Sequence, residues 1–146
     1  KDIGMDGVML HAPYLRLSKR ETIDFYKRIS KIGIPMILYN IPRKLPVELD
    51  VNLMKKLADE IDNFVAVKEA DRDFWHLTDK LELLGDEIAF LIGPCTLIFS
   101  GLLFGAVGYI ATGPEFLGKD CESIIKYVRD RNIEKAMEIH YKLCAM

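Results

Sequence analysis

Short apolar runs alternate with segments of helical spacing along the whole sequence of 146 residues. The runs are continuously apolar, as strands buried on both faces of a sheet require. Short connections between strand and helix imply right-handed crossovers, and therefore parallel strands of an α/β fold. The pattern predicts five strands, at residues 6–11, 34–39, 64–67, 88–92 and 107–111.

Residue types that begin and end helices mark the segments between these strands. Ser18 and Glu21 have the spacing of a capping box. Asp50 is placed to cap a second helix, and Asp71 or Asp73 a third. Together with their ends these signals predict helices at 19–33, 51–61, 74–85, 96–104, 114–131 with a break near Gly118, and from 133 onward.

Two architectures fit this alternation: an open doubly wound sheet, and part of a (β/α)8 barrel. A dinucleotide-binding sheet needs a glycine-rich turn after its first strand, but residues 11–14 read His-Ala-Pro-Tyr. An open-sheet nucleotide or phosphate protein would instead use the backbone at Gly93 or Gly113, and neither glycine lies in a recognised phosphate loop. The pattern therefore favours the barrel.

Charge and composition exclude several classes of partner. The net charge of −2 and the absence of a long basic run argue against nucleic acid. No apolar run has the length of a membrane span, and no signal peptide is recognisable, so we expect a cytoplasmic protein. The three cysteines and three histidines show no metal-ligand spacing, so neither a metal nor another cofactor is expected.

A lysine follows the third apolar run. Strand alternation over residues 64–67 predicts that Phe64, Ala66 and Lys68 share one face. Burial favours the neutral amine, which is a nucleophile towards carbonyl groups. Tyr39 ends the preceding strand, and a phenol beside an amine suits Schiff-base chemistry on a 2-oxo acid. The alternatives are a lysine that extends to water and a tyrosine that caps the core.

Five motifs then occur in a familiar order. They are Gly-Met-Asp-Gly-Val-Met at 4–9, Ala-Pro-Tyr at 12–14, Ile-Leu-Tyr-Asn-Ile-Pro at 37–42, Val-Lys-Glu-Ala at 67–70 and Leu-Phe-Gly-Ala-Val-Gly-Tyr-Ile at 103–110. Together they resemble the dihydrodipicolinate synthase / N-acetylneuraminate lyase family. The resemblance spans nearly the whole chain, and its most specific part is the pair formed by Tyr39 and Lys68.

The resemblance implies a (β/α)8 barrel whose strands four to eight lie in this chain, with residues 1–146 forming one partial barrel domain. It implies that Lys68 forms an imine with pyruvate or a related 2-oxo acid and that Tyr39 relays protons. Gly93 and the backbone at Ile110 would border the bound oxo acid. It also implies a homotetramer. Residues 1–4 resemble the tail of a helix and the helix from 133 ends while still apolar, so we expect a piece of a longer chain.

The sequence departs from the synthase pattern where the second substrate is selected. Leu15 stands where synthases have a second tyrosine. Lys44 aligns with the arginine that receives the second substrate's carboxylate, and Arg43 beside it is an alternative. Ile-Gly-Pro at 92–94 replaces a Ser-Gly-Asp pattern. These changes favour an aldolase or dehydratase of sugar-derived 2-oxo acids over the strict synthase. A strict synthase and a non-catalytic barrel homologue are the alternatives.

Overall fold

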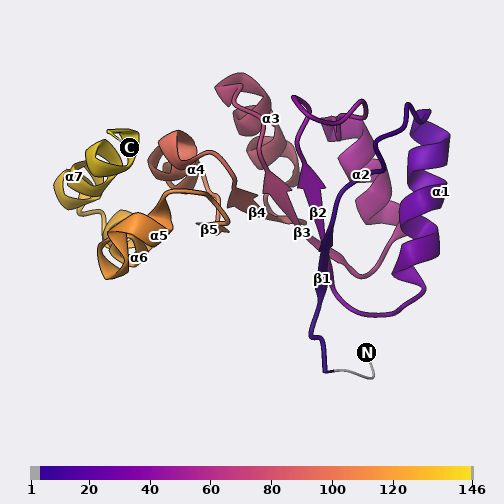
Figure 1. The fold of residues 1–146 in the computed structure, drawn as a ribbon, viewed down its shortest axis with the longest axis horizontal. Coiled ribbons are helices and arrows are strands. Elements are labelled where there is room, and N and C mark those ends of the chain that lie inside the picture. The colour runs from indigo at the N-terminus through magenta and orange to yellow at the C-terminus, as the bar shows by residue number, and fades with distance from the viewer. Residues whose placement is uncertain (1–3, 146) are drawn as a thin grey trace.

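A computed structural model describes residues 4–145 as one parallel sheet with helices (Figure 1). The strands are β1 (Val8–Leu10), β2 (Met36–Asn40), β3 (Phe64–Glu69), β4 (Ala89–Ile92) and β5 (Gly108–Tyr109). The helices are α1 (Lys19–Ser30), α2 (Val51–Glu60), α3 (Phe74–Leu84), a 3₁₀ turn η1 (Cys95–Leu97), α4 (Ile98–Leu103), α5 (Pro114–Leu117), α6 (Lys119–Arg129) and α7 (Ile133–Cys144).

The strand order confirms the architecture favoured by the sequence. All neighbouring strands are parallel, and their order in space, β1-β2-β3-β4-β5, is their order along the chain. A doubly wound sheet would reverse direction after its first strands. Each crossover here steps one strand further in the same direction, as in a (β/α)8 barrel.

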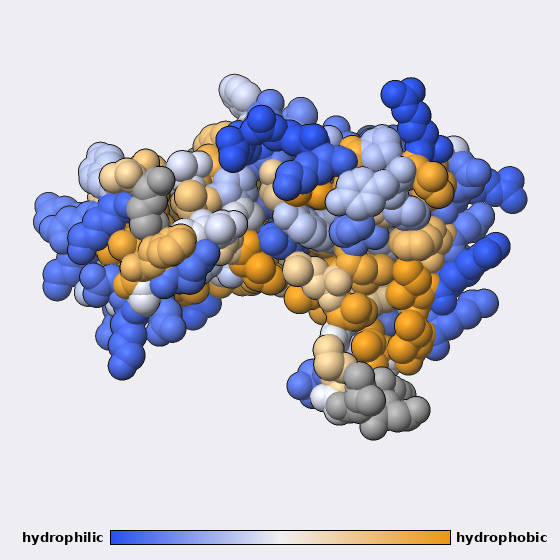
Figure 2. All heavy atoms as spheres, in the orientation of Figure 1, coloured by the Kyte–Doolittle hydropathy of each residue, from blue (hydrophilic) through white to orange (hydrophobic). Residues whose placement is uncertain are grey.

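Helices α1, α2 and α3 follow successive strands, and α4 to α7 gather beyond β4 and β5 (Figure 1). The core between sheet and helices contains Leu38, Val67 and Ile92, each fully buried. The opposite face is less covered: Met9 of β1 and Val65 of β3 are each more than two-fifths exposed. Figure 2 shows the apolar side chains of this view gathered low on the β1 side, with hydrophilic ones above the carboxyl ends of β2 and β3.

One expectation about side-chain direction is wrong. Phe64 does not share a face with Lys68, because the pairing of β2 with β3 shifts by one residue between Met36 and Ile37. Met36 pairs with Phe64, but Ile37 pairs with Ala66. Phe64 and Val67 both pack in the helix-side core, whereas Ala66 does not. Simple alternation cannot reveal such a shift, because nothing in the side-chain pattern marks the extra residue.

The helix starts follow the capping residues. Ser18 and Glu21 make the predicted capping box at α1. Asp50 accepts the Leu53 N–H at the start of α2, and Asp73, rather than Asp71, caps α3. Gly118, with φ at 53°, separates α5 from α6 at the predicted break.

Other boundaries differ from expectation. The helix predicted for 96–104 divides into η1 and α4, and the fifth strand is two residues long. The helix tail predicted at the start of the chain lies outside the described residues, apart from Gly4. The helix from 133 is α7, which ends at Cys144. Within residues 4–145 no helix combines the length and the apolar character that crossing a membrane requires.

Candidate active site

Tyr39 and Lys68 come together at the carboxyl ends of β2 and β3. They are register partners on these adjacent parallel strands, so both side chains leave the sheet on the same face. The Lys68 amine lies 4.0 Å from the centre of the Tyr39 ring, which is the geometry of a cation above an aromatic face. Both residues are partly exposed. Among the described residues, none accepts a hydrogen bond from this amine.

The next residue on each strand points to the opposite face and is buried. Asn40 follows Tyr39, Glu69 follows Lys68, and the two are again register partners. The Asn40 side-chain N–H group donates to both Glu69 carboxylate oxygens, at 2.9 and 3.0 Å. These bonds tie together the two strand ends that carry the amine and the phenol.

A buried lysine completes this network. Lys80 of α3 is 3% exposed, and its amine donates to Glu69 Oε2 at 3.0 Å. The Asp71 N–H donates to the other oxygen at 2.8 Å. The Leu49 N–H donates to Asn40 Oδ1 at 3.0 Å. The buried carboxylate thus joins β2, α3 and the start of the loop after β3, and this network holds the strand ends beside Lys68 in place.

A pocket of about 430 Å³ lies beyond the strand ends. This strand-end pocket is lined by Ile41, Arg43, Lys44, Ala70, Arg72, Gly93, Pro94 and Thr112. Ile41 stands two residues beyond Tyr39, and Ala70 two residues beyond Lys68. Both residues lie just past the ends of their strands, so the pocket adjoins the ends of β2 and β3, although neither Tyr39 nor Lys68 is among its lining residues. Its volume suits a small molecule.

The pocket contains three of the four residues that we predicted to bind substrate: Arg43, Lys44 and Gly93. The fourth, Ile110, is not part of the lining. Its N–H donates to the Ile92 carbonyl at 3.0 Å, which extends the pairing of β4 with β5. Thr112, two residues further on, lines the pocket instead.

Gly93 is required by a close approach of two backbones. Its N–H donates to the Glu69 carbonyl at 2.7 Å. A Cβ atom added at Gly93 would lie 2.8 Å from that oxygen and 2.8 Å from the Ala70 Cβ. A larger residue would push against the end of the strand that carries Lys68.

The two glycines that a phosphate-binding open sheet would use are already engaged. The Gly93 N–H donates to Glu69, and the Gly113 N–H donates to the Glu115 carboxylate at 2.7 Å. The Glu115 carboxylate beside Gly113 would also repel a phosphate anion. The backbone at these glycines therefore offers no phosphate cradle.

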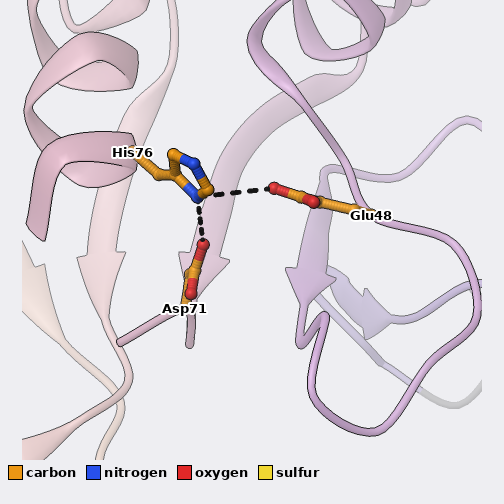
Figure 3. A group of neighbouring side chains, drawn as sticks. All are labelled: Glu48, Asp71 and His76. Atoms are coloured by element: carbon orange, nitrogen blue, oxygen red, sulfur yellow. Dashed lines mark hydrogen bonds and ion pairs between the residues drawn. The ribbon is translucent and has the colours of Figure 1, made fainter. Parts of the chain in front are cut away.

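Three polar side chains, Glu48, Asp71 and His76, point toward one another from separate parts of the chain (Figure 3). His76 Nδ1 lies 2.8 Å from Asp71 Oδ2 and 3.8 Å from Glu48 Oε1. Hydrogen bonding to Asp71 raises the pKa of His76, with further contributions from nearby carboxylates. Burial would raise the pKa of Asp71, but hydrogen bonds from His76 and the Asp73 N–H outweigh it and lower that pKa.

The same three residues hold potential ligand atoms within 4.8 Å of one another. The Lys80 amine lies 4.0 Å from Glu48 Oε1 and opposes a metal cation there. The ion pair of His76 with Asp71 already explains why these side chains lie close together without a metal ion. The spacing of the histidines gave no indication of this cluster, because its members come from three separate segments.

The ion pair of His76 with Asp71 predicts a pH-dependent effect on stability. Because folding raises the pKa of His76, its contribution is present below the unfolded value of about 6.5 and is lost as the pH rises through the folded value. Because folding lowers the pKa of Asp71, the pair also weakens at acid pH, below about 4. His76→Ala should therefore destabilise the full-length protein more at pH 5.5 than at pH 9.

The loss should stay below about 1 kcal/mol, since half of the His76 side chain is exposed and solvent screens the pair. Urea denaturation of the two proteins at both pH values measures it. Equal losses at pH 5.5 and pH 9 would mean that His76 contributes through packing and not through its charge.

Two functional candidates escaped prediction from the sequence. Lys80 stands three residues after Leu77 and four before Leu84, which places it on the apolar face of α3, and this spacing was the signal for its burial. Arg72 stands in the loop after β3 and carries no motif. Its position three residues after the end of β3, the strand that carries Lys68, was the only indication in the sequence that it could line the pocket.

Comparisons with known protein families and with individual proteins all identify the same family. The model of the dihydrodipicolinate synthetase family matches residues 1–146. A DapA-like lyase of Pyrobaculum islandicum, named as uncharacterized, is 33% identical over 98% of this chain and 48% of its own length. The 4-hydroxy-tetrahydrodipicolinate synthases of Aquifex aeolicus and Methanocaldococcus jannaschii are 30% and 34% identical, each over 98% of this chain. The chain spans about half the length of these relatives.

Solved structures agree in fold. The dihydrodipicolinate synthase of Aquifex aeolicus superposes with a TM-score of 0.91 at 29% identity, over 99% of this chain and 50% of that one. YagE of E. coli K12, a prophage protein of the dihydrodipicolinic acid synthase family in complex with pyruvate, gives 0.92 at 26% identity, over 98% of this chain and 50% of that one. The five parallel strands are thus part of a (β/α)8 barrel, as the sequence predicts.

Proposed function

Because this chain belongs to the dihydrodipicolinate synthetase family, we propose that it is part of a lyase in which Lys68 forms an imine with pyruvate or a related 2-oxo acid. The observation that carries the proposal is the pairing of Lys68 with Tyr39 on adjacent strand ends, with the amine 4.0 Å from the ring centre. The relative solved with pyruvate supports the substrate class.

The chemistry follows from the two side chains. The neutral Lys68 amine attacks the keto carbon, the carbinolamine loses water, and the resulting imine withdraws electrons from the neighbouring carbon. Protons must leave the amine and reach the departing hydroxyl group. We assign this relay to the phenol of Tyr39, whose ring contacts the amine, and the network of Asn40 and Glu69 holds the two strands in register. None of these steps uses a cofactor.

Borohydride reduction in the presence of pyruvate tests the proposal on the full-length protein. Hydride converts the imine to a stable secondary amine, and mass spectrometry of peptides locates it. We expect one adduct, on Lys68. A protein that forms no adduct is the non-catalytic barrel homologue, with Lys68 as a relic.

Tyr39→Phe should slow turnover by about 10²- to 10⁴-fold, the usual contribution of a positioned proton donor. Oxo-acid binding should change far less, since the ring and its contact with Lys68 remain. Steady-state kinetics separate the two effects through kcat and KM. An unchanged kcat would assign Tyr39 to packing alone.

The kind of lyase depends on the second substrate. Lys44 in place of an arginine, Leu15 and the Ile-Gly-Pro sequence favour an aldolase or dehydratase of sugar-derived 2-oxo acids. The second candidate is the synthase itself, which the names of the Aquifex and Methanocaldococcus relatives favour. Formation of 4-hydroxy-tetrahydrodipicolinate by the full-length protein would identify the synthase. The homotetramer and the cytoplasmic location stay predictions.

A further inference from the structure

His11 directly follows β1 and faces the same side of the sheet as Tyr39 and Lys68. The residues on either side of it face the helices: Leu10 packs against the helix-side core, and Ala12, 1% exposed, belongs to that core. Successive side chains of an extended strand alternate between its faces, so His11 projects to the opposite side. Tyr39 and Lys68 have the same surroundings, since the residues before and after each of them are at most 1% exposed.

The strand register places the imidazole beside the phenol. β1 and β2 pair as far as Leu10 and Leu38. The next residues, His11 and Tyr39, therefore stand opposite each other, and Tyr39 pairs in turn with Lys68. Neighbouring strands are about 4.8 Å apart, so side chains that leave them on one face at the same level are neighbours. Imidazole, phenol and amine thus form one row across three strand ends.

This row is polar only at these three positions. Beyond Lys68 it continues through Leu91 and Gly108, which have no titratable group. Within the described sheet, His11 is therefore the one further titratable side chain at the level of the reactive pair. The row one step nearer to the strand starts is apolar throughout, and consists of Met9, Ile37, Ala66 and Ala89.

One hydrogen bond fixes which nitrogen of His11 acts as a base. Nδ1 lies 2.6 Å from the carbonyl oxygen of Ala12. A carbonyl oxygen only accepts hydrogen bonds, so Nδ1 carries the hydrogen and Nε2 keeps its lone pair in the neutral ring. The Tyr14 ring, 5.2 Å away at an angle of 72°, further restricts the imidazole. The ring is thus held with one nitrogen engaged and the other available to accept a proton.

We propose that His11 Nε2 accepts the phenol proton of Tyr39 during imine formation, an inference that rests on the proposed imine chemistry. Attack of the Lys68 amine on the keto carbon leaves a positive nitrogen and a negative oxygen. A phenol alone must give up its proton before it can take one. With Nε2 as acceptor, the phenol oxygen takes the proton from nitrogen while its own proton moves to His11. The imidazolium then returns that proton to the phenol as the phenol protonates the oxygen, and no proton is gained or lost.

Exchange of the pyruvate methyl hydrogens for deuterium tests the proposal on the full-length protein, because it requires imine formation but no second substrate. NMR follows the exchange. His11→Asn keeps a side-chain N–H group for the Ala12 carbonyl and removes the base. At saturating pyruvate we expect this variant to exchange about 10²-fold more slowly, the lower end of the range for a proton-transfer group. The pyruvate concentration for half-maximal rate should change by less than about threefold, since the base does not bind the oxo acid.

Two further readouts distinguish proton transfer from packing. Added imidazole should restore exchange in His11→Ala by about tenfold or more, because it replaces the missing base. Adding His11→Asn to Tyr39→Phe should slow exchange by no more than about twofold beyond Tyr39→Phe alone, because His11 acts through the phenol. His140→Gln is the control. His140 is also partly buried, but it lies on α7, at the opposite end of the sheet from β1 (Figure 1), so exchange should be unchanged.

The outcomes separate the two proposals. If borohydride traps no pyruvate adduct in the unmodified protein, the imine chemistry itself is wrong. If the adduct forms and the His11 variants exchange at the original rate, the role of His11 is wrong and the imine stands. Slow exchange that imidazole does not restore, and that adds fully to the effect of Tyr39→Phe, would assign His11 to packing and overturn the inference. Loss of folding in both His11 variants would overturn it in the same way.

Discussion

Replacing Lys68 with alanine should abolish the pyruvate adduct and lower turnover by about 10⁴-fold or more, because the proposed imine forms on the Lys68 amine. The network beside it lies on the opposite face of the sheet and should stay intact. The variant should therefore fold like the original protein. Borohydride trapping, steady-state rates and thermal unfolding measure the three effects.

Lys56→Ala is a matched control for this variant. Lys56 lies on the exposed side of α2, away from the strand ends, so its loss should change neither the adduct nor the rate. Turnover that persists in the Lys68 variant would exclude the proposed mechanism. Loss of folding in that variant would instead assign Lys68 a structural role.

Replacing Lys80 with methionine should cost about 3–5 kcal/mol of stability, since it leaves the Glu69 carboxylate buried without its cation. Asn40 and the Asp71 N–H would remain as donors, but neither carries a charge. Denaturant unfolding of the full-length protein measures the loss. It is the largest of the stability effects that we predict for a single substitution.

A second variant and a control make this prediction specific. Adding Glu69→Gln to the Lys80 variant removes the unpaired charge and should recover part of the lost stability. Lys27→Met breaks the pair of Lys27 with Glu60, which water surrounds, and should change stability little. Similar losses of unfolding free energy in the Lys80→Met and Lys27→Met variants would show that the buried pair of Lys80 with Glu69 stabilises the fold no more than an exposed pair.

The sequence was sufficient for the order of the elements, because continuous apolar runs, capping residues and glycines are local signals. It was also sufficient to place Tyr39 and Lys68 at neighbouring strand ends, since parallel strands of consecutive units adjoin in a barrel. The residues at which strands end were predicted less accurately. β3 continues to Glu69, beyond the apolar run, because pairing with Asn40 extends it.

What the sequence could not give depends on contacts between distant segments. Lys80 is buried only because Glu69, eleven residues earlier, provides a partner on the helix face. The strand-end pocket depends on residues that come from separate loops. Ile110 was placed in the site by resemblance, while the pocket is lined by Thr112. Such properties are set by packing and by competition for partners, which no local pattern records.

The one-residue offset between β2 and β3 decides which way the reactive amine faces. Odd and even positions of a strand emerge on opposite sides, so an extra residue at Val65 reverses this parity for everything that follows it. If β3 paired with β2 without this offset, Lys68 would stand opposite the buried Asn40 and face the helices, and Glu69 would face the other side of the sheet. The orientation of the Lys68 side chain is thus set three positions upstream, at Val65.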